Sequence, residues 1–156
     1  MTKRSERSTH GLAGVFAVAS ELSCLGHGVA LTLGNTKGVD LFVSKKDTHL
    51  TVPVQIKTKF PDKGKYDYYW RVTRKGGEER LVFVFVIMNN DNRADYYVVP
   101  GKTVVRNSYW GNDYPGFPYN HATDISPNKK SIEKRIVFLK KFKIEKSADW
   151  NRLLWN

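Results

Sequence analysis

The sequence predicts an α/β fold in which a mixed central β-sheet is flanked by helices. Three observations support this class. Apolar residues recur with helical spacing near the N-terminus, residues 34–59 have the pattern of a β-hairpin, and Leu81 to Met88 is a continuous apolar run typical of a buried strand. With 156 residues, no internal repeat and no linker-like segment, residues 1–156 are expected to form one domain.

The chain carries a net charge of +11. This excess of Lys and Arg favours a polyanionic partner, although a basic surface without a partner has the same composition. The single cysteine, Cys24, excludes an internal disulfide and is typical of the cytoplasm, which is the predicted location. No apolar run is long enough to span a bilayer, so no membrane partner is predicted. The four histidines lack metal-ligand spacing and are expected at the surface: His10, His27, His49 and His121.

The N-terminal segment predicts a flexible arm followed by a helix. Residues 1–8 are basic and polar, and Ser8 or Thr9 can cap a helix that extends to about Leu25. At about 100° per residue, its apolar side chains form a broad arc that should pack on a sheet: Leu12, Val15, Phe16, Val18, Ala19, Leu22 and Leu25. Glu21 lies beside that arc, in a stripe with Gly14, Ala17 and Cys24. Its carboxylate could therefore lie along the sheet or face solvent.

The predicted hairpin carries a group of polar side chains near one end. Asp40 lies in its first arm, a polar connector spans residues 44–50, and Gln55 and Lys57 lie in the second arm. Because Gln55 and Lys57 are two residues apart, both leave the same face of the strand. If the arms pair, an acid, an amide oxygen and an ammonium group converge, which suits a hard cation beside a phosphate. A solvated strand face would have the same pattern.

The rest of the chain predicts further strands and a closing helix. Residues 66–73 are aromatic and β-prone, and the apolar run that follows should be a central strand covered on both faces. A further strand is expected at Asp95 to Val99, and Trp110 to Tyr119 has the composition of a long ordered loop. Ile136 to Ile144 alternates apolar and basic residues, and Ser147 is expected to cap the last helix.

Two motifs resemble those of the PD-(D/E)xK nuclease superfamily, which includes many restriction enzymes and archaeal Holliday-junction resolvases. They are G-x-x-x-G-x-D at Gly34 to Asp40 and Q-x-K-T at Gln55 to Thr58. The chain looks most like small bacterial proteins of that type, and the likeness extends over three more segments: Tyr66 to Trp70, Leu81 to Ile87 and Tyr97 to Pro100. The resemblance covers most of the chain and implies a restriction-endonuclease-like fold.

The resemblance also implies a Mg²⁺ or Mn²⁺ site and a role for each residue in it. Asp40 and Gln55 would be side-chain ligands, and Ile56 would supply its backbone carbonyl. Lys57 would orient or activate the attacking water. A helix glutamate often completes such a site, and Glu21 is the candidate here.

The chain departs from the pattern of this superfamily at two positions. Gln55 replaces the usual Asp or Glu, which removes one negative charge and weakens metal binding. The position at which resolvase-like relatives carry the helix glutamate holds Val15, and Glu21 lies six residues further on.

Basic residues near the hairpin are expected to contact nucleic-acid phosphates: Lys37, Lys59, Lys63, Lys65, Arg71 and Arg74. Such contacts give affinity without reading sequence. The aromatic residues 66–70 could stack on unpaired bases, although alternate members should be core. The predicted partner is DNA, with branched or damaged DNA among the candidate forms. The sequence does not distinguish DNA from RNA and leaves a homodimer open.

The leading functional hypothesis is a Mg²⁺-dependent DNA endonuclease that hydrolyses phosphodiester bonds with metal-activated water. A second hypothesis is a nucleic-acid-binding module on the same fold whose catalysis is weakened or lost, and it is favoured by Val15 and Gln55. A third is a subunit of a restriction, repair or phage-defence complex. Cleavage of plasmid and branched DNA with Mg²⁺ or Mn²⁺, compared with EDTA, separates these hypotheses.

Overall fold

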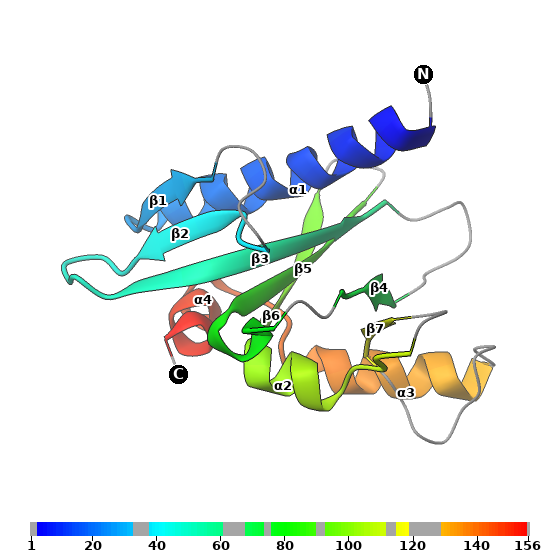
Figure 1. Cartoon of the computed structure of the whole chain (residues 1–156). Helices are drawn as coiled ribbons and strands as arrows, with labels where there is room; N and C mark the ends of the chain where they lie inside the picture. The colour runs from blue at the N-terminus through cyan, green and yellow to red at the C-terminus, as the bar shows by residue number, and fades with distance from the viewer. Residues whose placement is uncertain are drawn as a thin grey trace.

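The computed structural model describes residues 3–32, 38–60, 68–73, 76–89, 93–111, 115–118 and 129–155, without the side chains of residues 3–8, 129–132 and 148. A five-stranded sheet is at its centre, in the order β1-β2-β3-β5-β6 (Figure 1). Its strands are β1 Gly28–Leu31, β2 Leu41–Ser44, β3 Thr51–Lys59, β5 Val82–Met88 and β6 Ala94–Pro100. The pair β3–β5 is parallel and the other pairs are antiparallel, so the predicted mixed sheet is confirmed.

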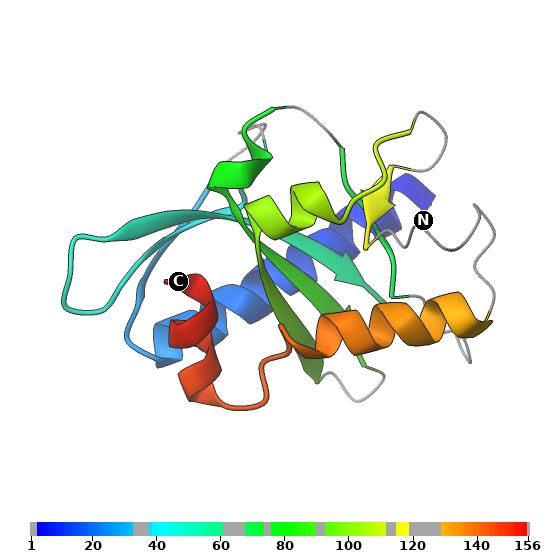
Figure 2. The same ribbon diagram turned by 90° about the horizontal axis from the view of Figure 1, so that it is seen from below.

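Helices cover both faces of this sheet, as the predicted α/β class requires. They are α1 Lys3–Cys24, α2 Gly101–Arg106, α3 Lys129–Lys140 and α4 Ser147–Leu154. A single 3₁₀ turn, η1, spans Glu78–Arg80, and a separate two-stranded sheet joins β4 Trp70–Arg71 to β7 Gly116–Phe117. Viewed from the side of α2 and α3, Figure 2 shows α1 behind the sheet.

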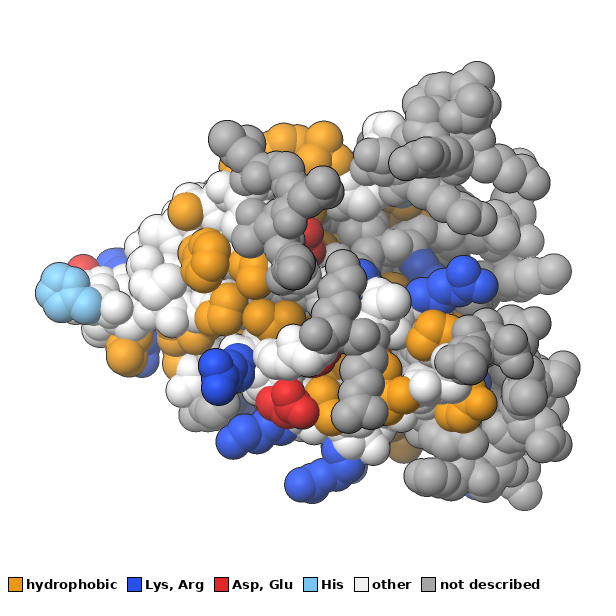
Figure 3. Space-filling view, viewed as in Figure 1, with side chains coloured by type: hydrophobic (Ala, Val, Ile, Leu, Met, Phe, Trp, Pro, Cys, Tyr) orange, Lys and Arg blue, Asp and Glu red, His pale blue; other side chains and the backbone are white. Residues whose placement is uncertain are grey.

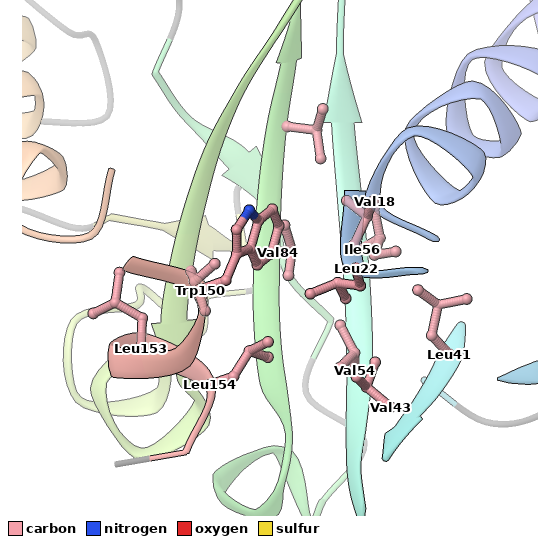
Figure 4. Close-up of a cluster of buried hydrophobic side chains, with 12 residues drawn as sticks. Val18, Leu22, Leu41, Val43, Val54, Ile56, Val84, Trp150, Leu153 and Leu154 are labelled. Carbon is pink, nitrogen blue, oxygen red and sulfur yellow. The ribbon is translucent and has the colours of Figure 1, made fainter. Parts of the chain in front are cut away.

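One face of the sheet packs against α1 and α4. Val18 and Leu22 of α1 meet Val54 and Ile56 of β3 in this core, and Trp150 of α4 packs against the same cluster (Figure 4). All five side chains are buried. Burying large apolar side chains in this way contributes roughly 1.5–3 kcal/mol each. The helical period of α1 predicts this inward face for Val15, Val18, Ala19, Leu22 and Leu25. It is wrong for Leu12 and Phe16, which were also expected to pack on the sheet but are exposed.

The opposite face of the sheet packs against α2, α3 and the β4–β7 sheet. Phe83 and Phe85 of β5 enter this second core together with Trp70 and Phe117. The residue between them, Val84, belongs to the first core. Successive residues of β5 therefore enter opposite cores, which confirms the predicted central strand covered on both faces.

Gly14 allows α1 to lie close to β3. A Cβ atom at this position would lie 2.9 Å from Cγ2 of Thr58, which is closer than real Cβ atoms come. The Thr58 hydroxyl also donates a hydrogen bond of 3.5 Å to the carbonyl oxygen of Gly11, one turn earlier in the helix. This contact holds the helix over the half of β3 that carries Lys57.

Several element boundaries differ from the sequence prediction. The first helix begins at Lys3 and needs no cap at Ser8 or Thr9, so the part of the expected arm from residue 3 onward is helical. The alternating segment after Ile136 continues α3 as far as Lys140, because its apolar residues Leu139 and Phe138 pack on the second core. Within the described residues, no helix has the length and apolar character needed to cross a bilayer.

Candidate functional site

Asp40 is anchored to β3 through both its backbone and its side chain. Its N–H donates to the carbonyl of Val54 over 2.8 Å, and its carboxylate oxygen Oδ2 accepts from the N–H of Ile56 over 2.7 Å. The carbonyl of Asp40 accepts a bond from the N–H of Thr32 at 3.1 Å. Asp40 thus extends the contact between the hairpin strands by one residue beyond their last pair, Leu41 with Val54. Its other carboxylate oxygen, Oδ1, has no hydrogen-bond partner among the described residues.

Gln55 and Lys57 lie on the same face of β3, as predicted from their spacing. Their neighbours in the parallel register are Phe83 and Phe85, which point to the second core, whereas Ile56 points to the first. Both polar side chains are half-buried. The carboxylate of Asp40 accepts the N–H of Ile56, the residue between them. The structure therefore brings Asp40 next to the part of β3 that carries Gln55 and Lys57, at the end of β2.

Gly38 explains why a glycine occurs two residues before the acid. It has a φ of 73°, in the left-handed region that favours glycine. A Cβ atom added there would lie 3.8 Å from Nε2 of Gln55. The turn before Asp40 therefore passes directly beside the Gln55 amide, which gives a physical reason for the G-x-D spacing.

The Ile56 carbonyl is directed toward the same side as the Asp40 carboxylate. In a strand, the N–H and C=O of one residue point toward the same neighbouring strand. Since the N–H of Ile56 bonds to Asp40, its C=O also leaves β3 on the β2 side, beyond the last β2 pair at Leu41. The oxygen types at this end of the hairpin are thus a carboxylate, an amide and a backbone carbonyl, all of which are ligands for Mg²⁺.

The structure does not bring Glu21 to Asp40. Glu21 is exposed on α1, and its charge is felt at Tyr96 of β6. Burial raises the pKa of Tyr96 to about 12, and the Glu21 carboxylate adds to this rise. Strands β3 and β5 separate β6 from β2 in the sheet. Leu22 occupies the inward face of the helix, and Glu21 lies about 100° around the helix axis from it.

Val15 fills the position expected for the helix glutamate. Its side chain is partly buried and packs against the first core. In the described residues, no group of three or more His, Cys, Asp or Glu side chains could hold a metal ion. Within the described part of the chain, the ligands for a metal ion at the hairpin would therefore be one carboxylate and neutral oxygens. Water and substrate would supply the remaining ligands.

Two of the six predicted phosphate contacts fall on described residues. Lys59 is half-buried at the end of β3, and Arg71 is exposed on β4. Figure 3 shows basic surface in the region of β4 and apolar surface over β1 and β2. The other four residues lie outside the described part of the chain: Lys37, Lys63, Lys65 and Arg74.

Sequence reasoning missed two features near the hairpin. Phe42 follows Asp40 by two residues on the same face, and it is 41% exposed, so an aromatic ring is available beside the acid. His27, expected at the surface, is only 6% exposed, with Nδ1 accepting the N–H of Lys46 at 3.1 Å. Burial lowers the pKa of His27, and Lys45 and Lys46 lower it further. The two-residue spacing from Asp40 was the signal for Phe42, whereas the burial of His27 has no signal in local residue spacing.

No protein-family model matches the sequence, and the comparison with curated proteins returns no match. Among solved structures, the chain is similar to a bacterial homing endonuclease, with a TM-score of 0.50, 18% identity and coverage of 85% of this chain and 91% of the other. MepB is similar with a TM-score of 0.42 and 14% identity, over 75% of this chain and 84% of its own. The first similarity shows that the mixed α/β fold is one that a nuclease also uses.

Proposed function

We propose that the protein is a metal-dependent DNA endonuclease of the PD-(D/E)xK type. The observation that carries this proposal is the position of Asp40, whose Oδ2 bonds to the backbone between Gln55 and Lys57 while its Oδ1 has no partner among the described residues. The fold shared with a homing endonuclease supports the same interpretation. The charge of +11 supports a polyanionic substrate.

The residues at the hairpin fit Mg²⁺ or Mn²⁺, for which they would supply part of the set of oxygen ligands. Asp40 would hold the ion through Oδ1, Gln55 through its amide oxygen and Ile56 through its carbonyl, because hard cations prefer oxygen ligands. When bound, such an ion polarises a phosphate and lowers the pKa of water. With a single carboxylate, affinity for the free ion should be low until a substrate phosphate joins.

Lys57 would act on the water that attacks the phosphorus atom. Its side chain leaves the same strand face as Gln55, one residue beyond the backbone that Asp40 contacts. An ammonium group there can donate a hydrogen bond that orients the water and can stabilise negative charge that develops on the phosphate. Lys59 and Arg71, with the basic residues of the adjoining segments, would neutralise flanking phosphates.

A second function, DNA binding without cleavage, is favoured by Gln55 and by the exposure of Glu21 on α1. The experiment that separates the two uses purified protein with plasmid and branched DNA in Mg²⁺, Mn²⁺ or EDTA. Cleavage that depends on the ion and disappears in folded Asp40→Asn and Lys57→Ala variants would support the endonuclease. If the protein binds DNA without a metal ion and never cleaves it, the endonuclease proposal fails and DNA binding without cleavage takes its place.

A further inference from the structure

Arg135 of α3 is a buried cation that the candidate metal site does not use. It is 8% exposed, and its Nε atom is enclosed without a hydrogen-bond partner. Its guanidinium carbon lies 5.0 Å from the centre of the Tyr69 ring, and this ring is its only partner among the described residues. Burying a charge without an anion is costly, so the arrangement favours a negatively charged ligand.

The Tyr69 ring is held in place by the backbone of β7. Gly116 lies against this ring, and a side chain at Gly116 would collide with it. Gly116 also pairs with Arg71 in the β4–β7 sheet, so ring and strand are positioned together. A guanidinium is planar and presents its outer N–H groups in one plane, which suits two-point binding of a phosphate.

This cation lies on the same side of the main sheet as Gln55 and Lys57. Lys57 is paired in register with Phe85, whose ring lies 4.8 Å from the rings of both Trp70 and Phe117. Phe138 of α3 in turn lies 5.9 Å from Phe117. The β4–β7 sheet and α3 therefore lie on the side of the main sheet to which Lys57 points (Figures 1 and 2).

The charge of this surface suits a phosphate rather than a cation. The α3 sequence has one acid, Glu133, against five basic residues: Lys129, Lys130, Lys134, Arg135 and Lys140. Arg71, the β4 residue next to the buried Trp70, is exposed. We propose that Arg135, held by Tyr69, binds a backbone phosphate of DNA at a subsite beyond the candidate metal site. This proposal rests on the nucleic-acid part of the proposed function and does not require cleavage.

The test measures binding of a mixed-sequence DNA duplex in EDTA, so that no cleavage occurs. Arg135→Met should weaken binding about 5- to 10-fold at about 50 mM salt and reduce the slope of log affinity against log salt by about 0.9, the value for one phosphate contact. Arg135→Lys should recover part of the loss. Arg152→Met is the matched control, because Arg152 is an exposed helical arginine on α4, against the opposite face, and should bind as the parent does.

Thermal unfolding separates a binding role from a structural one. The free Arg135→Met protein should melt at the parent temperature or above it, because an uncompensated buried charge is removed. Parent-like affinity and salt slope in Arg135→Met would overturn the phosphate subsite, and so would a lowered melting temperature with an unchanged slope. If the parent protein binds DNA but does not cleave it, the endonuclease proposal fails and the phosphate-subsite proposal remains. If the parent protein does not bind DNA, both proposals fail.

Discussion

Replacing Asp40 by asparagine separates its structural role from its proposed catalytic one. The carboxylate accepts the N–H of Ile56 at 2.7 Å, and Ile56 is only 7% exposed, so this donor needs a partner. The amide oxygen of the introduced asparagine could accept the same hydrogen bond, but it carries no charge for a metal ion. Asp40→Ala would instead leave the Ile56 N–H without its acceptor.

The two substitutions should therefore differ in stability but not in activity. Exchanging a charged acceptor for a neutral one should cost about 1 kcal/mol, whereas an unsatisfied buried donor should cost about 1–3 kcal/mol. Loss of the proposed carboxylate ligand should remove about 3–4 kcal/mol of transition-state stabilisation. That corresponds to a loss in cleavage rate of roughly a hundredfold to a thousandfold for both variants.

The assay combines urea unfolding with plasmid cleavage over a Mg²⁺ titration. Asp40→Asn should unfold close to the parent and Asp40→Ala at lower urea, while both variants cleave roughly a hundredfold to a thousandfold more slowly than the parent. Glu21→Gln should retain parent cleavage, because Glu21 is exposed on α1 and its charge acts on Tyr96 of β6; a loss of about tenfold would return Glu21 to the site. Cleavage by Asp40→Asn at the parent rate would refute the metal-ligand reasoning, and equal stability of the two Asp40 variants would refute the role assigned to the hydrogen bond.

Gln55→Glu should add the missing charge at the hairpin and lower the Mg²⁺ concentration needed for cleavage by about tenfold; a Mg²⁺ titration in which the requirement rises or stays unchanged would contradict this. Gly14→Ala should destabilise the protein by about 1–3 kcal/mol because its Cβ collides with Thr58, whereas Gly11→Ala, with nothing within 4 Å, should stabilise by about 0.5–1 kcal/mol. Urea unfolding compares the two, and equal effects would show that the helix does not lie this close to the sheet. Burial lowers the pKa of His27, so the unfolded chain takes up the proton first and stability should fall as the pH drops from about 7 through the lowered pKa. His27→Asn should flatten that dependence in unfolding curves across the range, and a parent equally stable throughout would count against a buried neutral imidazole.

Much of the fold and of the hairpin could be predicted from local sequence. Period-2 alternation decides which strand residues share a face, so the common side of Gln55 and Lys57 follows from their spacing alone. The helical period likewise places Val18 and Leu22 against the sheet. The contact of Asp40 with β3 was also predictable, because two strands joined by a short connector usually pair as an antiparallel hairpin.

Other features were decided by the tertiary structure. The rotation of α1 about its axis, set by Leu22 and by the close contact of Gly14 with Thr58, directs Glu21 toward β6. The environment of Arg135 depends on Tyr69, which is distant in sequence and lies against Gly116 of the β4–β7 sheet. Spacing along the chain determines which face a side chain takes within its own element. What lies opposite that face depends on how separate elements pack, which no local pattern encodes.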